Sequence, residues 1–255
     1  MACGRFNALL RPKIGQWRSL QRAAHYKRTV MPVNTYHRFR RKEQHKLQPQ
    51  KFKYFLVLDF EATCDNDYFP DMEIIEFPCL KVDSKTFKVV DTFHSYVRPV
   101  KHPLLSPFCV ELTGIVQDMV DDKPPFPEVL EQFSKWLDDS DISLTEPEPN
   151  AAFITCGDWD LQKMLPNQCL LSGLAIPPRM KSWINIKKSF LRATGLYPHG
   201  IKDMLSQLNL KHEGRLHSGI DDCKNIVRIL HGVAERGYVF EITRTLSLPH
   251  KSVSQ

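Results

Sequence analysis

The order of the predicted elements indicates an α/β protein whose mixed β-sheet is flanked by α-helices. Three segments with strand character come first, at residues 54–61, 73–82 and 88–98. From residue 151 onwards, a buried strand is followed by several predicted helices. A meander of strands followed by strand–helix alternation is typical of a mixed sheet covered by helices. The sequence shows no internal repeat and no sign of a second domain.

The first three strands are predicted from their composition and spacing. Residues 54–58 form an uninterrupted apolar run, which is typical of a buried central strand. Residues 88–98 alternate between two sets of side chains, as a strand does. The turn-like residues 83–86 lie between the second and third strands, so these two strands are expected to form a hairpin.

The helices are predicted from apolar residues at helical spacing, most clearly Val129, Leu130 and Phe133. Residues 138–150 are acidic and contain proline, and are expected to form a surface loop. Helices are expected at residues 106–111, 127–137, 158–165, 186–194, 201–208 and 220–236, and a further buried strand at 151–156.

The charge is distributed unevenly along the chain. Residues 1–50 contain 12 Lys and Arg against one acid, Glu43, whereas the remaining residues contain 23 basic and 28 acidic side chains. The net charge of +6 therefore belongs to the N-terminal segment, and the rest is mildly acidic. An acidic body with a basic arm is not a simple basic-groove binder of nucleic acid, and some of its carboxylates are candidates to hold metal ions.

Residues 1–53 are predicted to be a basic and largely disordered tail, because they mix Arg, Lys, Gln, Pro and His without apolar periodicity. Three explanations stay open for this tail. It is an electrostatic arm for phosphate backbones, a mitochondrial transit peptide, or a solvated or nuclear-targeting tail whose densest part is residues 37–42.

Composition also bears on compartment. No stretch approaches the ~20 consecutive apolar residues of a membrane-spanning helix, so no association with a membrane is expected. The 7 cysteines are dispersed without a Cys-x-x-Cys pair, which argues against a structural zinc site and a disulfide framework. Dispersed thiols fit a reducing compartment, so an intracellular location in the cytoplasm or nucleus is expected. The mitochondrion is the alternative, because residues 1–42 contain no acid.

The first chemical signal is Asp59-Phe60-Glu61, at the end of the first predicted strand. Side chains two residues apart on a strand point to the same face. Two carboxylates on one face of an apolar strand repel each other and lose hydration, and a divalent cation would offset this. A strand that simply ends at the surface explains the pair as well.

The second signal is Asp158 and Asp160, which directly follow the buried strand at 151–156. Asp158 suits a helix N-cap. Asp160 would lie in the first helical turn, near the carboxyl end of the strand, where α/β proteins commonly assemble their sites. Taken alone, Asp160 is better explained as an acid that favours the helix dipole.

The third signal is His217 followed five residues later by Asp222. Asp222 shares helical spacing with Ile226 and Ile229 and is therefore expected to point inwards. Asp221 lines up with Asn225 and is expected to face solvent. His217 lies on a loop with Gly and Ser, and a solvated loop histidine is the alternative to a catalytic one.

Asp-x-Glu on a strand, an Asp at a strand–helix junction and His-x4-Asp on a late helix together resemble the DEDDh exonuclease superfamily. Further segments are similar to the enhanced-RNAi (histone-mRNA-type) 3′–5′ exoribonucleases, and the chain is most similar to their prion-protein-interacting branch. The segments are Leu58-Asp59-Phe60-Glu61-Ala62-Thr63-Cys64, Glu73-Ile74-Ile75-Glu76-Phe77-Pro78, Leu112-Thr113-Gly114-Ile115, Cys156-Gly157-Asp158-Trp159-Asp160-Leu161, Trp183-Ile184-Asn185-Ile186 and Arg215-Leu216-His217-Ser218-Gly219-Ile220-Asp221-Asp222.

The resemblance covers about residues 54–242 and implies an RNase H-like fold, with residues 243–255 as a C-terminal tail. No counterpart of the SAP domain of the histone-mRNA member is found, so stem-loop targeting by that route is not implied. The implied activity is metal-dependent 3′–5′ hydrolysis of RNA to nucleoside 5′-monophosphates, in RNA processing or decay. The implied partner is RNA with a free 3′ end.

The resemblance also implies roles for individual residues. Asp59 bridges two Mg²⁺ ions, for which Mn²⁺ could substitute. Glu61 and Asp160 complete one site, Asp222 supports the second, and His217 acts as the general base; Glu61 and His217 are the catalytic candidates. The residues implied in binding the terminal nucleotide are Ala62, Leu112, Thr113, Ile115, Trp159 and His217.

Two alternatives remain at this point. A DNA or short-oligonucleotide exonuclease on the same scaffold would carry the same catalytic residues, because RNA is distinguished by contacts to its 2′-OH. A catalytically silent RNA-binding adaptor is the other alternative. The feature against it is that all five catalytic positions are filled.

Overall fold

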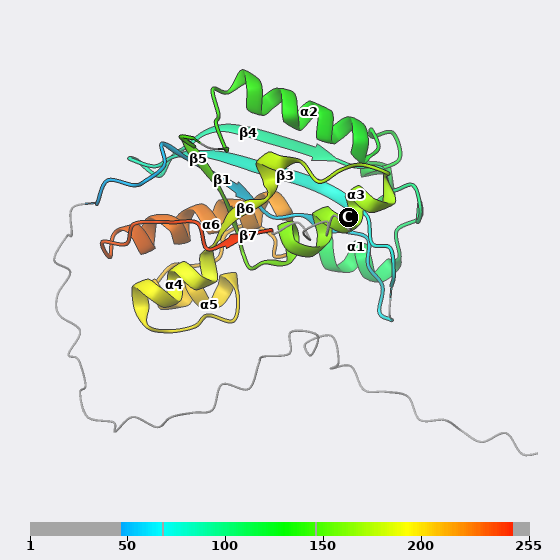
Figure 1. The fold of residues 1–255 in the computed structure, drawn as a ribbon. Helices are drawn as coiled ribbons and strands as arrows, with labels where there is room; N and C mark the ends of the chain where they lie inside the picture. Colours follow the sequence, from blue (N-terminus) through cyan, green and yellow to red (C-terminus); the bar gives the residue numbers. More distant parts are fainter. Residues whose placement is uncertain (1–46, 68, 146, 247–255) are drawn as a thin grey trace, which may run out of the picture. The chain divides into compact units, whose positions relative to one another are not determined.

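The computed structural model describes residues 47–67, 69–145 and 147–246, which contain one seven-stranded mixed sheet (Figure 1). Strand β3 pairs with β1 and then β2 along one edge and with β4 along the other, and the sheet continues from β1 through β5 and β6 to β7. The strands are β1 (Tyr54–Leu58), β2 (Glu61–Ala62), β3 (Ile74–Asp83), β4 (Val89–Tyr96), β5 (Ala151–Thr155), β6 (Ser182–Asn185) and β7 (Arg244–Thr245).

Helices cover both faces of this sheet (Figure 1). They are α1 (Pro107–Thr113), α2 (Phe126–Asp139), α3 (Leu165–Leu171), α4 (Ile186–Thr194), α5 (Ile201–Gln207) and α6 (Gly219–Ala234), with 3₁₀ turns at Gln117–Met119 and Pro178–Met180 and a π-helical turn at Asp160–Met164. None of the helices in the described ranges has both the length and the apolar character needed to cross a membrane.

The parallel part of the sheet determines where the predicted acids meet. β1 pairs in parallel with β5, with Val57 opposite Ile154. Their carboxyl ends therefore lie at the same edge of the sheet. Asp59 follows β1 and Asp160 follows β5 after a short turn, so residues about 100 positions apart in the chain are brought to one place.

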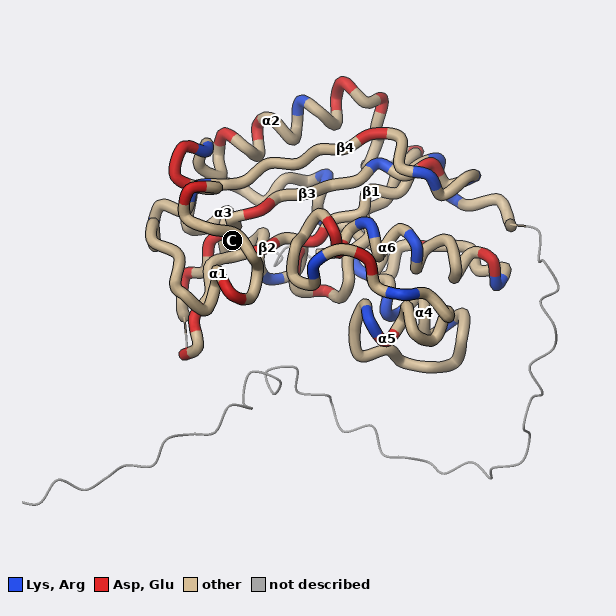
Figure 2. Tube along the Cα trace, turned by 180° about the vertical axis from the view of Figure 1, so that it is seen from behind, with Lys and Arg blue, Asp and Glu red and all other residues tan. Residues whose placement is uncertain are grey.

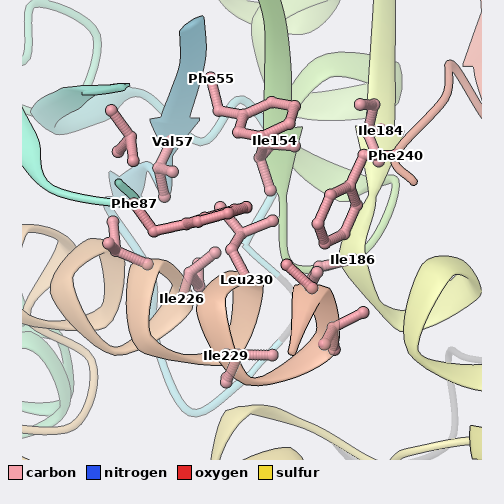
Figure 3. Packing of buried hydrophobic residues seen from close by; sticks show 14 of the residues in the cluster. Phe55, Val57, Phe87, Ile154, Ile184, Ile186, Ile226, Ile229, Leu230 and Phe240 are labelled. Carbon is pink, nitrogen blue, oxygen red and sulfur yellow. The ribbon is translucent and has the colours of Figure 1, made fainter. Parts of the chain in front are cut away.

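Alternation along β1 divides the core between the two faces of the sheet. Phe55 and Val57 pack in one cluster with residues of α4, α5 and α6, and Figure 3 shows them on one side of Phe87, with Ile226 and Leu230 on the other. The intervening Leu56 and Leu58 pack with α2 and α3 on the other face. The core is therefore continuous on both sides of the central strand, as its apolar composition predicts.

The predicted α/β class, a mixed sheet flanked by helices, is confirmed, but several details differ from expectation. β6 and β7 were not predicted, because both are short. The strand expected at 54–61 is interrupted, since β1 ends at Leu58 and β2 begins at Glu61. The hairpin of β3 and β4 forms as predicted.

The packed body extends beyond both expected boundaries. Phe52 is buried, and Gln50 Nε2 donates to the Tyr238 carbonyl at 3.1 Å, although residues 47–53 were assigned to the tail. At the other end, β7 pairs with β6 beyond the expected limit at residue 242. The predictions for residues 1–46 and 247–255 lie outside the described residues.

The start of α6 approaches β1 so closely that it requires glycine. A Cβ added to Gly219 would lie 2.6 Å from the Asp59 backbone oxygen, and a backbone atom is not free to move away. A Cβ on Gly232, in the same helix, would lie 3.0 Å from a methyl group of Leu208, which is the flexible end of a side chain.

We expect Gly219→Ala to lower the free energy of unfolding by about 1–3 kcal/mol, as overpacking of a rigid site does. Gly232→Ala is the matched control and is expected to lose much less, because Leu208 can shift and Ala favours helix. Urea unfolding of the three proteins measures both changes. Equal losses for the two glycines would contradict the assigned contact.

Candidate active site

Asp59 and Glu61 lie on either side of a residue that is buried in the core. Phe60 is 4% exposed, and its ring centroid lies 4.8 Å from that of Phe77, with the rings edge to face. Glu61 begins β2 and stands opposite Glu76 in the pairing with β3. The pair of acids is therefore positioned by a break between two short strands and not by one regular strand.

Asp160 is tied directly to this break. It lies in the π-helical turn after β5 and is 4% exposed, and its Oδ1 accepts the Phe60 backbone N–H at 2.9 Å. Turns of this kind are frequent at functional sites. The hydrogen bond fixes the Asp160 carboxylate against the backbone between Asp59 and Glu61.

Asp158 is not the N-cap that was expected. Its two oxygens accept from Trp183 Nε1 at 3.0 Å and from Lys188 Nζ at 2.8 Å. The side chain therefore joins the loop after β5 to β6 and α4. This role depends on residues remote in sequence, which is why local spacing favoured a cap.

Asp222 points inwards from the first turn of α6, as its spacing predicted, and is 3% exposed. Its Oδ2 accepts the backbone N–H of His217 at 3.0 Å. His217 itself is exposed and has a positive φ of 59°. Asp221, which was expected to face solvent, is half-buried and accepts the Arg215 N–H at 3.0 Å. Asn225, which shares its helical spacing, is fully buried against the loop that precedes α6.

A fifth carboxylate, Glu76 on β3, was not among the predicted site residues. It is 1% exposed and accepts from the backbone N–H groups of Gly219 at 2.9 Å and Ile220 at 3.2 Å, and His94 Nε2 lies 2.8 Å away. Glu76 therefore holds the N-terminus of α6 against the sheet. The signal that could have revealed it is an acid within an otherwise apolar strand.

Burial and mutual repulsion raise the pKa values of these acids. Burial, and then the neighbouring carboxylates of Asp160 and Glu61, hold the pKa of Asp59 well above its usual range. Burial and then the Glu76 carboxylate raise the pKa of Glu61 to about 9. Burial raises the pKa of Asp160 to about 6, although the Phe60 N–H opposes this effect.

For Asp222 and His217, the effects that raise the pKa and those that lower it partly cancel. Burial raises the pKa of Asp222, while hydrogen bonds from His212 and from the His217 N–H lower it. Burial lowers the pKa of His217, with Asp222 acting in the opposite direction. The lowered pKa favours the neutral imidazole, which is the form able to accept a proton.

The donor set fits a hard divalent cation. Ligand atoms of Glu61, His217 and Asp222 lie within 4.8 Å of one another. Asp59 and Asp160 contribute further carboxylates, which act electrostatically on the same cluster. Carboxylate oxygens are the ligands that Mg²⁺ prefers, and a cation would relieve their repulsion. Without it, some of these acids retain protons.

The residues implied in substrate binding differ in how far they are exposed to solvent. Ala62 and Ile115 are buried, and Thr113 uses its hydroxyl within the protein, donating to the Cys109 carbonyl at 2.8 Å. Leu112, on α1, is partly exposed. Trp159 is 41% exposed and directly precedes the buried Asp160 in the chain.

Comparison with known proteins shows which family this fold and site belong to. A family model described as Exonuclease matches residues 56–230. Human ERI1 exoribonuclease 3 is 51% identical over 196 residues, which cover 76% of this chain and 58% of that protein.

Solved structures give the same result. The nuclease domain of 3′hExo, a DEDDh family member, bound to rAMP has a TM-score of 0.72 at 38% identity, and the match covers 76% of this chain and 98% of that one. A structure of 3′-end specific recognition of a histone mRNA stem-loop by a 3′-exonuclease has a TM-score of 0.73 at 37% identity, covering 78% of this chain and 69% of that one.

The class is therefore that of exonucleases with an RNase H-like fold. Within it, the chain belongs to the DEDDh family, and the resemblance to the enhanced-RNAi (histone-mRNA-type) exoribonucleases is confirmed. The chain matches little more than half of the length of its curated relative.

The raised pKa values predict how pH changes the stability of the metal-free protein. With its pKa at about 9, Glu61 keeps in the folded state a proton that the unfolded chain releases near the ordinary glutamate pKa of 4.5. Stability is therefore highest below pH 4.5 for this group and falls as pH rises towards 9, by up to about 1.4 kcal/mol per pH unit for one fully retained proton.

Thermal unfolding in chelator between pH 5.5 and 8.5 measures this slope against Glu61→Gln, which is expected to show a flatter profile. Added Mg²⁺ should raise Tm most at the alkaline end, because it binds the ionised carboxylates. Superimposable profiles for the two proteins would show that Glu61 does not carry a raised pKa.

Proposed function

We propose that this protein is a metal-dependent 3′–5′ exoribonuclease that releases nucleoside 5′-monophosphates from RNA. The observation that carries the proposal is the group of buried carboxylates, from the break after β1, the turn after β5 and the start of α6, with an exposed histidine beside them. The names of the relatives as exoribonucleases, and the rAMP in one structural relative, support RNA as the substrate.

The proposed cofactor is a pair of Mg²⁺ ions, with Mn²⁺ as a substitute. Asp59 would lie between them, Glu61 and Asp160 would complete one site, and Asp222 would support the other. When bound, the ions supply activation of the attacking water and stabilisation of the negative charge on the leaving 3′ oxygen. Two of these proposed ligands, Asp160 and Asp222, are held in place by backbone N–H groups.

His217 is proposed to take the proton from the attacking water. Its ring is exposed and therefore reaches water and substrate, whereas Asp222 is buried. The lowered pKa favours the neutral ring. The N–H of His217 is bonded to Asp222, so the position of the base is linked to that of a proposed ligand.

The terminal nucleotide would lie between Trp159 and α1. Stacking of an unpaired base on an aromatic ring contributes ~1–3 kcal/mol. Leu112 offers a partly exposed apolar contact on α1, while the buried Thr113 and Ile115 would shape the site from behind. Ala62, which follows Glu61, would bring its backbone close to the sugar.

The charges on the two helical layers suggest where the RNA backbone runs. The exposed side of α2 is mainly acidic, whereas α4 and α5 carry Lys188, Arg192 and Lys202 (Figure 2). Lys202 is exposed and acts electrostatically on His217, so it lies near the proposed base. Lys188 pairs with Asp158 and is partly neutralised. Lys202 is therefore the better candidate for a phosphate contact.

The proposed activity is tested with 5′-labelled and 3′-labelled RNA, single-stranded and stem-loop, and with DNA of the same sequence. We expect a ladder of one-nucleotide steps and release of 5′-mononucleotides with Mg²⁺ or Mn²⁺, and none with chelator. Cleavage that is independent of metal contradicts the mechanism. Equal or faster degradation of DNA contradicts the choice of RNA.

His217→Ala distinguishes a base from a metal ligand. If His217 is the base, the variant loses most of its turnover, by about 10²–10⁴-fold, yet binds Mn²⁺ and RNA as the wild type does. If His217 is a ligand, as its place near Glu61 and Asp222 also allows, Mn²⁺ binding weakens as well. Calorimetric titration with Mn²⁺ and filter binding of RNA separate the two results. His199→Ala serves as the control.

A further inference from the structure

A second histidine, His212, contacts the inward carboxylate of α6. We infer that His212 is a positioning residue that orients Asp222 towards a bound divalent cation; this inference rests on the proposed metal-dependent function. The His212 Nε2 atom lies 3.3 Å from Asp222 Oδ1, and the side chains are 16% and 4% exposed. His212 lies within the matched range of the family but outside the motif segments quoted for the resemblance.

The hydrogen-bond partners determine which ring nitrogen of His212 carries the proton. The Asn225 amide nitrogen lies 3.4 Å from His212 Nε2, but its two hydrogens go to the carbonyls of Asp221 at 2.9 Å and Glu213 at 2.7 Å. No donor is left for His212 from Asn225. A bare Nε2 lone pair would face the Asp222 carboxylate unfavourably, so Nε2 carries a hydrogen and donates it to Asp222 Oδ1.

The backbone on both sides of His212 is held to α6. Arg228 Nη1 donates to the Lys211 carbonyl at 2.7 Å. On the other side, Asn225 Oδ1 accepts the Glu213 N–H at 3.1 Å, and Asn225 Nδ2 donates to the Glu213 carbonyl. The ring of His212 is therefore presented to Asp222 from a segment that is fixed at both ends.

The result is an Asp222 carboxylate with a donor on each oxygen. Oδ1 faces His212 Nε2, and Oδ2 accepts the His217 N–H at 3.0 Å. These two bonds from different parts of the loop prevent the carboxylate from rotating. An ionised carboxylate has about four lone-pair sites, so each oxygen keeps one for a cation. Hydrogen-bonded partners of this kind orient metal ligands and raise metal affinity.

The first test is His212→Phe, which keeps a ring but removes the donor. We expect Mn²⁺ affinity to fall by about tenfold, the lower end for loss of a group that supports a ligand, because the 3.3 Å contact is long. Mn²⁺ binding is measured directly from the electron paramagnetic resonance signal of the free ion. In turnover, the concentration of Mn²⁺ for half-maximal rate should rise about as much, with kcat at saturating Mn²⁺ within about twofold of wild type.

Conservative variants keep the inference falsifiable if His212→Phe does not fold. In His212→Gln, the glutamine side chain can place an N–H near Asp222. In His212→Asn, the asparagine side chain is too short to reach it. We expect wild-type Mn²⁺ binding for the Gln variant and weakened binding for the Asn variant. Glu213→Ala is the matched control: it removes the ion pair with Arg228 next to His212 but leaves the Asp222 contact intact.

The outcomes separate the role of His212 from the proposed function. Unchanged Mn²⁺ affinity in the Phe and Asn variants overturns the role of His212, while a wild type that binds Mn²⁺ and cleaves RNA leaves the proposed function standing. Equal weakening in the Gln and Asn variants also overturns it, since a donor would then not be what matters. A wild type that binds no Mn²⁺ overturns the proposed function and this inference together.

Discussion

The structure depends on holding several buried carboxylates together against their own repulsion. Asp59, Glu61, Asp160, Asp222 and Glu76 act on one another electrostatically, and the burial of the last four removes much of the water that would screen them. Backbone N–H groups compensate part of this. Asp160 accepts from Phe60, Asp222 from His217, and Glu76 from Gly219 and Ile220 at the positive end of α6. Among the described residues, no backbone N–H is bonded to the carboxylate of Asp59 or Glu61, and the pKa values of both remain high. A divalent cation would neutralise the remaining repulsion between the carboxylates. The free energy that is lost when the acids are brought together without metal would then be recovered when the metal binds.

The same constraint explains the close packing around the site. Backbone donors stabilise an acid only at hydrogen-bond distance, and therefore the elements that supply them must approach the sheet closely. Gly219 allows the start of α6 to approach the Asp59 backbone oxygen. Glu76 on β3 holds this end of the helix by accepting the Gly219 N–H. The parallel pairing of β1 with β5 brings the turn that carries Asp160 to the same edge. Large side chains on both faces of the sheet, such as Phe77 and Phe153 on one face and Phe55 on the other, then keep these elements from separating.

The sequence predicts the parts of the site that have a local signature. Asp59 and Glu61 stand out as charges beside an apolar run, and Asp222 follows from helical spacing with Ile226. The residues that were missed or misassigned act through partners far away in the chain. Glu76 bonds to residues more than 140 positions later, and Asp158 bonds to Trp183 and Lys188 instead of capping its own helix. β7 was missed because two residues carry no periodicity. Asp221 was expected to face solvent together with Asn225, because a pattern on one helix does not show the loop that covers this face.

The proposed metal ligands and the proposed general base differ in burial and in how firmly the structure holds their side chains. Proposed ligands such as Asp160 and Asp222 are buried and bound to backbone N–H groups, which suits residues that must keep a fixed geometry around an ion. His217 is exposed and sits at a positive φ between Arg215, whose N–H bonds to Asp221, and the start of α6. Its backbone is therefore fixed through Asp222 while its ring remains in contact with solvent. The proposed general base would need this combination, because a fully buried imidazole could not exchange its proton with solvent and an unanchored one would lose its alignment with the water molecule.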